Sequence, residues 1–526
     1  MRFNGQTSRH TARIVTFSVL SLGMMAGLAG CELGPNFRAP QPHVPAQFTA
    51  TGAPAQDHDK ISNAAIDTSW WQSFHDPVLS ALEHDAASQN LDVKIATQRL
   101  AEARAQAEIE GATLYPSLDF AGSFTREGPS KKGIFTALGG GSNTGTATNA
   151  AKTAAGTNSS IGGGGIPGSA IQPFNLFQYG FSSVFDFDLW GKNRRTREAA
   201  LAAVTASADA RRAVLLNIEA EVAQDYISLR ADQTLLAIAQ RNLRTADHLT
   251  KLTQERAQAG LANALEVADS EAQAASVQAQ IPALRAAIAG QESQIGLLLG
   301  RSPGALNAQL SAPQAVPAAP PLVPVGLPSQ LLTRRPDVRE AVAKLHEATA
   351  EIGVATADFF PDITLSGSVS LQALQFSNLN QLAAVTYAIG PEITMPLFEG
   401  GKLRGQLRLR KAEQREAAVN YAKTVLTALH QVDDTLTDYD QEQRRLQSLN
   451  REVAASQHAL TLAQERYRQG LADYLQVLTA QQSVLGAEQT QAQSLTAIST
   501  DLVKLYQALG GGWEQTYPVT TAQKTP

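Results

Sequence analysis

The chain has 526 residues, more than one ordinary core needs, and only 6% of them are aromatic within an apolar share of 43%. Long stretches of Ala, Gln and Leu favour helices packed in close bundles. The net charge of -5 argues against nucleic acid as a partner, and a single cysteine excludes an internal disulfide. No run of about 18 apolar residues follows the N-terminal region, so the sequence predicts no transmembrane helix there.

Residues 1–30 have the layout of a secretory signal peptide, because arginines precede an apolar run from Ile14 to Ala29. A membrane anchor that stays attached is the alternative, but the run is short for that and polar residues follow it. The sequence Leu28-Ala29-Gly30-Cys31 resembles a bacterial lipobox, in which cleavage leaves Cys31 as the acylated first residue. Residues 31–68 hold scattered Pro and Gly and predict a lipidated, extended tether.

A first structural repeat is predicted over residues 69–302. Asp76 as N-cap, with a proline at the first helical position, begins one helix that is expected to end near Tyr115. The apolar period then changes to two, which predicts a β-hairpin over 117–189. The loop of this hairpin, residues 128–172, is rich in Gly, Ala, Ser, Thr and Asn and cannot build a core.

Two helices complete this repeat. Residues 192–259 contain no Gly or Pro and predict a long coiled-coil helix, which at about 1.5 Å per residue would be roughly 100 Å long. After a turn at Gly260 the chain returns as a helix over 263–299, in which Pro282 and Gly290 predict a break or a kink.

The chain then repeats this order of elements. A Pro-rich linker, 303–328, leads to a second repeat over 329–512, followed by a C-terminal tail over 513–526. The turn Gly260-Leu261-Ala262 recurs 210 positions later as Gly470-Leu471-Ala472, in a matching context that chance does not supply. After its first helix, the second repeat is expected to hold a β-hairpin over 362–397, a long helix over 403–469 and a return helix over 473–509.

The four predicted strands have about 10 to 13 residues and are long enough to cross a bilayer at a tilt. Four strands cannot close a membrane barrel, and an open sheet edge is not tolerated in lipid. The smallest lipid-spanning barrels have about eight strands. Several chains must therefore share one barrel, and the helical hairpins, which have two exposed sides, also need neighbours.

Several short motifs resemble those of the outer membrane efflux protein family, in the lipoprotein branch that serves drug exporters of the resistance-nodulation-division class. The resemblance covers residues 31 to about 513. The motifs are Trp70-Trp71 with Phe74 and Asp76-Pro77, Arg334-Arg335-Pro336-Asp337, Phe360-Pro361, Phe398-Glu399-Gly400-Gly401, and Tyr467 with Gly470, Leu475, Val477-Leu478 and Ala480-Gln481.

The resemblance implies a mainly α fold with a membrane β portion. Three chains would form a 12-stranded barrel in the outer membrane that continues into an α-barrel tunnel across the periplasm. The protein would be a passive conduit for drugs or other toxic small molecules, without catalytic residues, metal or cofactor. Its implied partners are two sister chains, outer membrane lipid, a periplasmic membrane-fusion adaptor and an inner-membrane pump. The insertion at 128–172 is longer than this family predicts.

The two Gly-Leu-Ala turns are the first candidate functional residues. As the resemblance implies, residues 260–262 and 470–472 would lie at the periplasmic tip and contact the adaptor. The alternative is that Gly260 and Gly470 only permit a positive φ between two helices. We retain both interpretations, in which the glycines shape the turns and Leu261 and Leu471 offer the contact.

Residues beside the second turn are candidates for a gate. Three-fold symmetry would bring Asp473 and Leu475 of three copies toward one axis, where rings of carboxylates or leucines can close a narrow pore. The alternatives are that Asp473 is a helix N-cap and Leu475 a residue of the helical seam. Arg466 and Tyr467 could latch the closed state through bonds between helices, or could lie on a solvated helix face.

Three other classes of function fit the sequence less well than a drug-export conduit. An enzyme would need a catalytic or metal-binding cluster, and the groups His75-Asp76 and Glu83-His84-Asp85 have no matching cluster elsewhere. A soluble coiled-coil scaffold does not explain the aromatic-rich hairpins or the lipobox. A conduit for a type I protein secretion system would have the same tube, but the lipid anchor and the motifs favour drug export.

Overall fold

The computed structural model describes residues 32–42, 44–48, 61, 62, 64, 66–128, 173–320 and 323–518. The predicted lipidation site at Cys31 and nearly all of the Gly-rich loop 128–172 lie outside these residues. No helix of the described residues is both long and apolar enough to cross a membrane. The chain divides into a strand unit, made of Met1–Leu33, Gly111–Arg194 and Thr356–Leu403, and a helical unit, made of Gly34–Glu110, Arg195–Ala355 and Arg404–Pro526.

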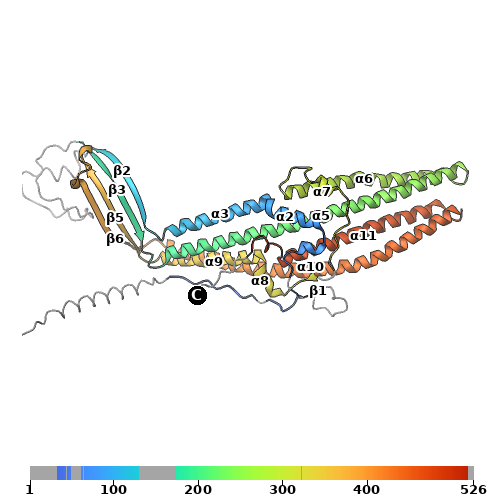
Figure 1. The fold of residues 1–526 in the computed structure, drawn as a ribbon. Helices are drawn as coiled ribbons and strands as arrows, with labels where there is room; N and C mark the ends of the chain where they lie inside the picture. The colour runs from blue at the N-terminus through green and yellow to red at the C-terminus, as the bar shows by residue number, and fades with distance from the viewer. Residues whose placement is uncertain are drawn as a thin grey trace, which may run out of the picture. The chain divides into compact units, whose positions relative to one another are not determined.

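The strand unit is one antiparallel sheet of four strands in the order β2-β3-β5-β6 (Figure 1). Two short 3-10 turns, Phe376–Asn378 and Leu382–Ala384, connect the last two strands. The strands are β2 (Ser117–Glu127), β3 (Phe174–Asp186), β5 (Asp362–Ala373) and β6 (Val385–Thr394). The predicted antiparallel hairpins are confirmed, and β2 and β6 are the two edges of the described sheet.

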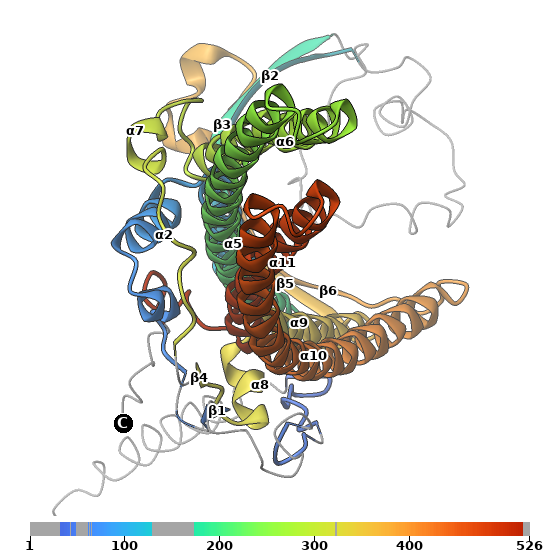
Figure 2. The same cartoon turned by 90° about the vertical axis from the view of Figure 1, so that its right-hand side faces the viewer.

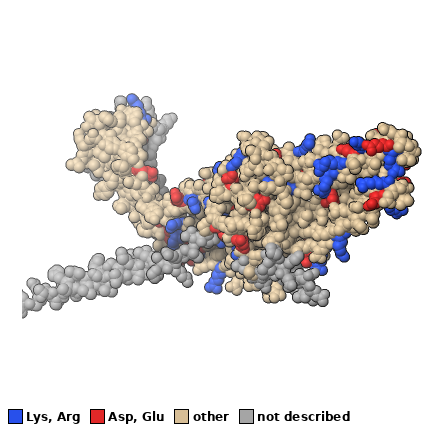
Figure 3. Space-filling view, turned by 45° about the vertical axis from the view of Figure 1, so that its right-hand side comes forward, with Lys and Arg blue, Asp and Glu red and all other residues tan. Residues whose placement is uncertain are grey.

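The strand register gives the sheet one apolar and one polar face, because successive side chains point to opposite sides. One row of paired residues across the four strands is Phe120, Phe181, Val369 and Tyr387. The next row, one residue along, is Asp119, Ser182, Ser368 and Ala388. The apolar row is exposed, with Tyr387 at 80%, and charged side chains are sparse on the visible face of this unit (Figure 3). Within the described part of the chain, the apolar face therefore lacks the covering that a soluble sheet has.

Seven helices of eight or more residues make up most of the rest of the described chain. They are α2 (Pro77–Gln89), α3 (Leu91–Ala112), α5 (Lys192–Gln258), α6 (Ala264–Leu298), α9 (Pro336–Ala357), α10 (Lys402–Arg468) and α11 (Tyr474–Leu509). The short elements are η2 (Trp70–Phe74), α7 (Asn307–Leu310), η3 (Pro328–Gln330), α8 (Leu331–Arg334), and the paired two-residue strands β1 (Ile61–Ser62) and β4 (Val323–Pro324).

The two long helices α5 and α10 each have 67 residues, and each is followed by a shorter returning helix. At about 1.5 Å per residue, a helix of this length spans roughly 100 Å. Figure 2 shows the α5–α6 and α10–α11 hairpins beside each other. The first returning helix was predicted to have a break or a kink, and the break is not found, since α6 continues through Pro282 and Gly290. A proline inside a helix removes one backbone hydrogen bond, and the other bonds of α6 keep it continuous.

The prediction of one helix from Asp76 to Tyr115 is also wrong, because Asn90 divides it into α2 and α3. Asn90 has an extended ψ of 136°, and its side-chain oxygen accepts from the backbone N–H groups of Asp92 and Val93 at 2.8 and 3.0 Å. Its amide group donates to the carbonyl of Leu298 at 2.7 Å. The buried side chain thus caps α3 and joins it to the end of α6.

The predicted N-cap at Asp76 is confirmed, because its carboxylate accepts from Val78 and Leu79 and a proline holds the first helical position. The other carboxylate oxygen accepts from the Tyr226 hydroxyl at 2.7 Å. This bond joins α2 to α5 in the main hydrophobic core of the helical unit. Trp70 stacks on Tyr506 in the same core at a ring distance of 5.5 Å.

Two irregular segments lie against the helical unit. Asn36 of the predicted tether accepts from Arg195 of α5 at 2.6 Å, and the neighbouring Phe37 stacks on His346 of α9 at 4.4 Å. The linker is the second segment, and the carbonyl of its Ala312 accepts from Arg230 of α5 at 2.7 Å. Ser499 of α11 donates to the carbonyl of Pro317 at 2.6 Å. The linker therefore bonds to helices of both repeats.

Two buried carboxyl groups lie in the main core, Glu83 of α2 and Glu219 of α5. Neither oxygen of Glu83 has a hydrogen-bond partner in the described residues. Burial raises the pKa of Glu83 well above its ordinary value of 4.5, and the nearby Glu219 raises it further. Burial likewise raises the pKa of Glu219. Both groups are therefore stable in the core in their protonated form.

This burial predicts a pH dependence of stability. When the pH rises above 4.5, the Glu83 carboxyl ionises first in the unfolded chain, so the free energy of unfolding falls until the folded pKa is passed. In Glu83→Gln this decrease should be smaller, because the amide does not ionise. Thermal unfolding measured from pH 4 to pH 8 checks this, with the exposed Glu102→Gln as the control. An unchanged pH dependence in Glu83→Gln would contradict the assignment.

Candidate functional site at the ends of the helical hairpins

The turns that end α5 and α10 have the same backbone geometry. Gly260 and Gly470 have φ of 72° and 76°, in the left-handed region that glycine enters without strain. In the first turn the N–H of Leu261 donates to the carbonyl of Arg256, and in the second turn Leu471 donates to Arg466, both at 2.8 Å. These bonds form a Schellman motif, so the glycines do shape the turns.

The residues after the two glycines are open to solvent in the described chain. Leu261 is 69% exposed and Leu471 is 65% exposed. Apart from the glycine and its two chain neighbours, no atom of the described residues lies within 4 Å of the position that a Cβ would take at Gly260 or Gly470. Two equivalent apolar side chains are thus available at this end of the helical unit for contact with another molecule.

The residue that begins each returning helix is an N-cap. Asn263 accepts from the N–H of Glu266 at 2.9 Å, and Asp473 accepts from the N–H of Gln476 at 3.3 Å. The cap alternative for Asp473 therefore holds, and the rest of its side chain remains exposed. Leu475 is 63% exposed, so it is not part of a helical seam within this chain.

Tyr467 joins the second hairpin to the first. Its side chain is only 1% exposed, so the solvated-face interpretation is wrong for this residue. Arg256 donates to the Tyr467 carbonyl at 2.6 Å, and the guanidinium lies 4.4 Å from the centre of the ring. The Tyr467 hydroxyl donates to Glu266 at 3.3 Å. Arg466, in contrast, is exposed.

An apolar layer surrounds this contact. It consists of Leu249, Tyr467, Tyr474 and Val477, and we call it the tip layer. The rings of Tyr467 and Tyr474 meet edge to face at 5.8 Å. Burial raises the pKa of the Tyr467 hydroxyl and raises that of Tyr474 to about 12. Both hydroxyls are therefore protonated at neutral pH, so that of Tyr467 can donate to Glu266.

Sequence reasoning did not identify Arg256 and Glu266 as site residues. In the sequence, Arg256 stands out only because Arg466 occupies the equivalent position 210 residues later. The structure gives the two different environments, since Arg256 is half-buried and Arg466 is exposed. Helical periodicity gives the face on which a residue lies, but it does not say which neighbouring hairpin covers that face. The contact with Tyr467 therefore required the three-dimensional structure.

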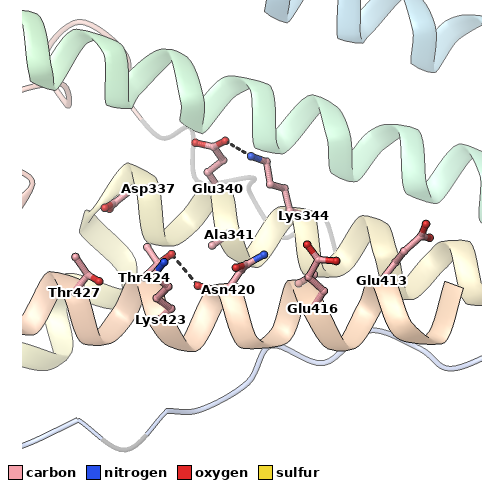
Figure 4. Close-up of a pocket in the computed structure, with 11 residues that line it drawn as sticks. Asp337, Glu340, Ala341, Lys344, Glu413, Glu416, Asn420, Lys423, Thr424 and Thr427 are labelled. Carbon is pink, nitrogen blue, oxygen red and sulfur yellow. Dashed lines mark hydrogen bonds and ion pairs between the residues drawn. The ribbon is translucent and has the colours of Figure 1, made fainter. Parts of the chain in front are cut away.

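The other candidate sites do not have the geometry of a catalytic or metal centre. The described residues contain no group of three or more His, Cys, Asp or Glu that could hold a metal ion. Glu83 is buried in the core, and Asp85 pairs with Arg301 at 2.5 Å. A groove of about 730 Å³ between α9 and α10 contains acidic and basic side chains, of which Glu340 and Lys344 pair at 2.6 Å (Figure 4).

Comparison with known proteins gives one family over nearly the whole chain. The profile described as "Outer membrane efflux protein" matches residues 82–301 and 327–511. The antibiotic efflux pump outer membrane protein ArpC of Pseudomonas putida is 32% identical over 507 residues, which cover 95% of this chain and 97% of the relative. The probable outer membrane lipoprotein SilC of Salmonella typhimurium is 29% identical over 505 residues, or 94% of this chain and 98% of the relative.

The fold is also found in solved structures. The outer-membrane channel OprN superposes with a TM-score of 0.80 and 30% identity, and the match covers 92% of this chain and 100% of that channel. The similarity therefore includes the helical hairpins and the strands together.

Proposed function

We propose that this chain, which belongs to the outer membrane efflux protein family, supplies one third of a passive trimeric conduit. The protein is an outer membrane channel component of an efflux system and is not an enzyme. The described sheet has an exposed apolar face and two open edges, which supports the assembly of several copies into one barrel. Three copies would give twelve strands, which is within the range of closed lipid-spanning barrels.

The cargo that we propose is a drug or another toxic small molecule. The relative ArpC is named for antibiotic efflux, and the chain matches it over nearly its whole length. The tube itself would provide the path, while a pump in the inner membrane would supply the energy. A periplasmic membrane-fusion adaptor would connect the two.

We place the adaptor contact at the Gly-Leu-Ala turns, residues 260–262 and 470–472. The support is that Leu261 and Leu471 are exposed on two turns of identical geometry. A leucine on a rigid turn can enter an apolar pocket of a partner without ordering a flexible loop first.

Leu471→Asp should greatly reduce drug export, because a carboxylate in an apolar contact is left without a partner. The fold should be unaffected, since Leu471 is 65% exposed. Drug accumulation and the minimal inhibitory concentration of an exported antibiotic measure the effect in cells that lack the native channel. Leu462→Asp, which alters a 51% exposed leucine of α10, is the control. Normal export by an intact Leu471→Asp trimer would exclude this contact.

We infer that the closing constriction lies beside the second turn. Asp473 and Leu475 are exposed, as side chains that line a pore must be. Arg256, Glu266 and Tyr467 would hold the second hairpin against the first while the pore is closed. Arg466 is exposed and would contribute its charge to the same region. Three carboxylates around a narrow axis would control ion passage.

Asp473→Asn separates the charge of this residue from its role as helix cap. Asparagine caps a helix about as well as aspartate, whereas alanine loses about 1 kcal/mol of cap stability. If the carboxylate helps close the pore, Asp473→Asn alone should change the conductance and the cation selectivity of single channels in a planar bilayer. A change seen only with Asp473→Ala would show that the cap, and not the charge, matters.

We also propose that Cys31 carries the lipid anchor. The support is the lipobox-like sequence before it and the similarity to a relative named as a lipoprotein. Labelled palmitate should enter the wild-type protein, and Cys31→Ser should abolish this labelling because it removes the only thiol of the chain. Continued labelling of Cys31→Ser would exclude Cys31 as the acylated residue.

A further inference from the structure

A second polar contact joins the two helical hairpins farther from the turns. Glu488 of α11 is only 7% exposed. Its Oε2 accepts from Arg241 at 2.9 Å and from Asn242 at 3.2 Å, both on α5. Its Oε1 accepts from Gln457 of α10 at 3.0 Å. We call these four residues the Glu488 layer.

The Glu488 layer lies between the tip layer and the linker along α11. From Tyr474 to Glu488 the helix rises about 20 Å at about 1.5 Å per residue. An apolar cluster of Ile238, Val277, Leu485 and Ala492 packs at the same level. Two glutamine pairs also join α6 to α11 near this level, Gln273 with Gln482 at 3.1 Å and Gln280 with Gln489 at 3.0 Å.

The tip layer and the Glu488 layer differ in the interactions that would be lost if the two hairpins separated. In the tip layer, separation would break the bond from Arg256 to the Tyr467 carbonyl at 2.6 Å and the bond from the Tyr467 hydroxyl to Glu266 at 3.3 Å. Arg256 and Glu266 are only half-buried, so water can take the place of the partner that each of them loses. In the Glu488 layer, separation would remove two donors from a buried carboxylate, and a buried charge without donors is strongly unfavourable. The Glu488 layer is therefore harder to open than the tip layer.

The internal repeat shows that this carboxylate is specific to the second hairpin. The position that corresponds to Glu488, 210 residues earlier, is Gln278. Gln278 has an amide and is exposed, whereas Glu488 has a carboxyl group and is buried. A feature inherited from the duplicated unit would occur in both hairpins, whereas the Glu488 layer occurs only in the second hairpin's position.

We propose that the Glu488 layer is a second latch between the hairpins, which confines an opening movement to the segment between this layer and the turns. The proposal rests on the proposed function, because it assumes that the channel opens at the turns. When the tip layer separates, the Glu488 layer holds α11 on α5 and acts as the fixed end of the movement. It thereby sets how wide the pore becomes.

Single-channel conductance of purified trimers in planar bilayers tests this latch. The variants are Tyr467→Phe, which weakens the tip layer, Glu488→Gln, which removes the buried charge at constant size, and the double variant. Glu452→Gln, an exposed glutamate of α10, is the matched control and should behave as the wild type. Arg241→Gln provides a milder second variant, because the Arg241 side chain is 55% exposed and its replacement should not affect folding.

Tyr467→Phe should raise the conductance, and the double variant should raise it by more than the product of the two single fold-changes. Arg241→Gln combined with Tyr467→Phe should change the conductance in the same direction by a smaller factor. A double variant that equals Tyr467→Phe would overturn the latch and leave the proposed function intact. Wild-type conductance in all variants would overturn closure at the tip layer, and the latch with it.

Discussion

The structure depends on one constraint, which is that the backbone groups of the edge strands β2 and β6 need hydrogen-bond partners. In water an open edge can bind solvent, but in lipid it cannot. The apolar face of the sheet requires lipid, since its aromatic side chains are exposed in the single chain. These two requirements conflict until other copies complete the sheet, so the isolated chain carries the structural reason for its own assembly.

The helical unit has a different requirement, because the two long helices of about 100 Å and the shorter returning helices must keep one register along their length. Apolar Ala and Leu contacts alone allow neighbouring helices to slide. Polar contacts at separate levels fix the register, from Arg230 with the linker to Glu488 and then Tyr467. Each of these groups is buried and has specific partners, so a shift by one turn would leave it without a hydrogen bond.

Much of this fold could be predicted from the sequence, because the relevant signals are local or repeated. The period of two gave the strands, and the recurrence of Gly260 as Gly470 gave the two hairpins. The break at Asn90 was missed because the cap that this side chain forms on α3 is held in place by a bond to the distant carbonyl of Leu298. Of the break or kink predicted at Pro282, the break does not occur, because one lost bond does not end a well-supported helix. At the site, the exposure of Leu471 follows from a turn, whereas the burial of Tyr467 depends on the other hairpin.

The proposed opening of the channel depends on the positions at which the two repeats differ. Duplication gives both hairpins the same turn and returning helices of 35 and 36 residues, so these features alone favour neither hairpin as the one that moves. Arg256 contacts Tyr467 while its counterpart Arg466 is exposed, and Glu488 is buried while its counterpart Gln278 is exposed. The guanidinium groups of Arg256 and Arg241 in the first hairpin thus hold the Tyr467 carbonyl and the Glu488 carboxylate of the second hairpin. In the proposed opening, such an asymmetry would make the second hairpin the element that is released, with the first as its support.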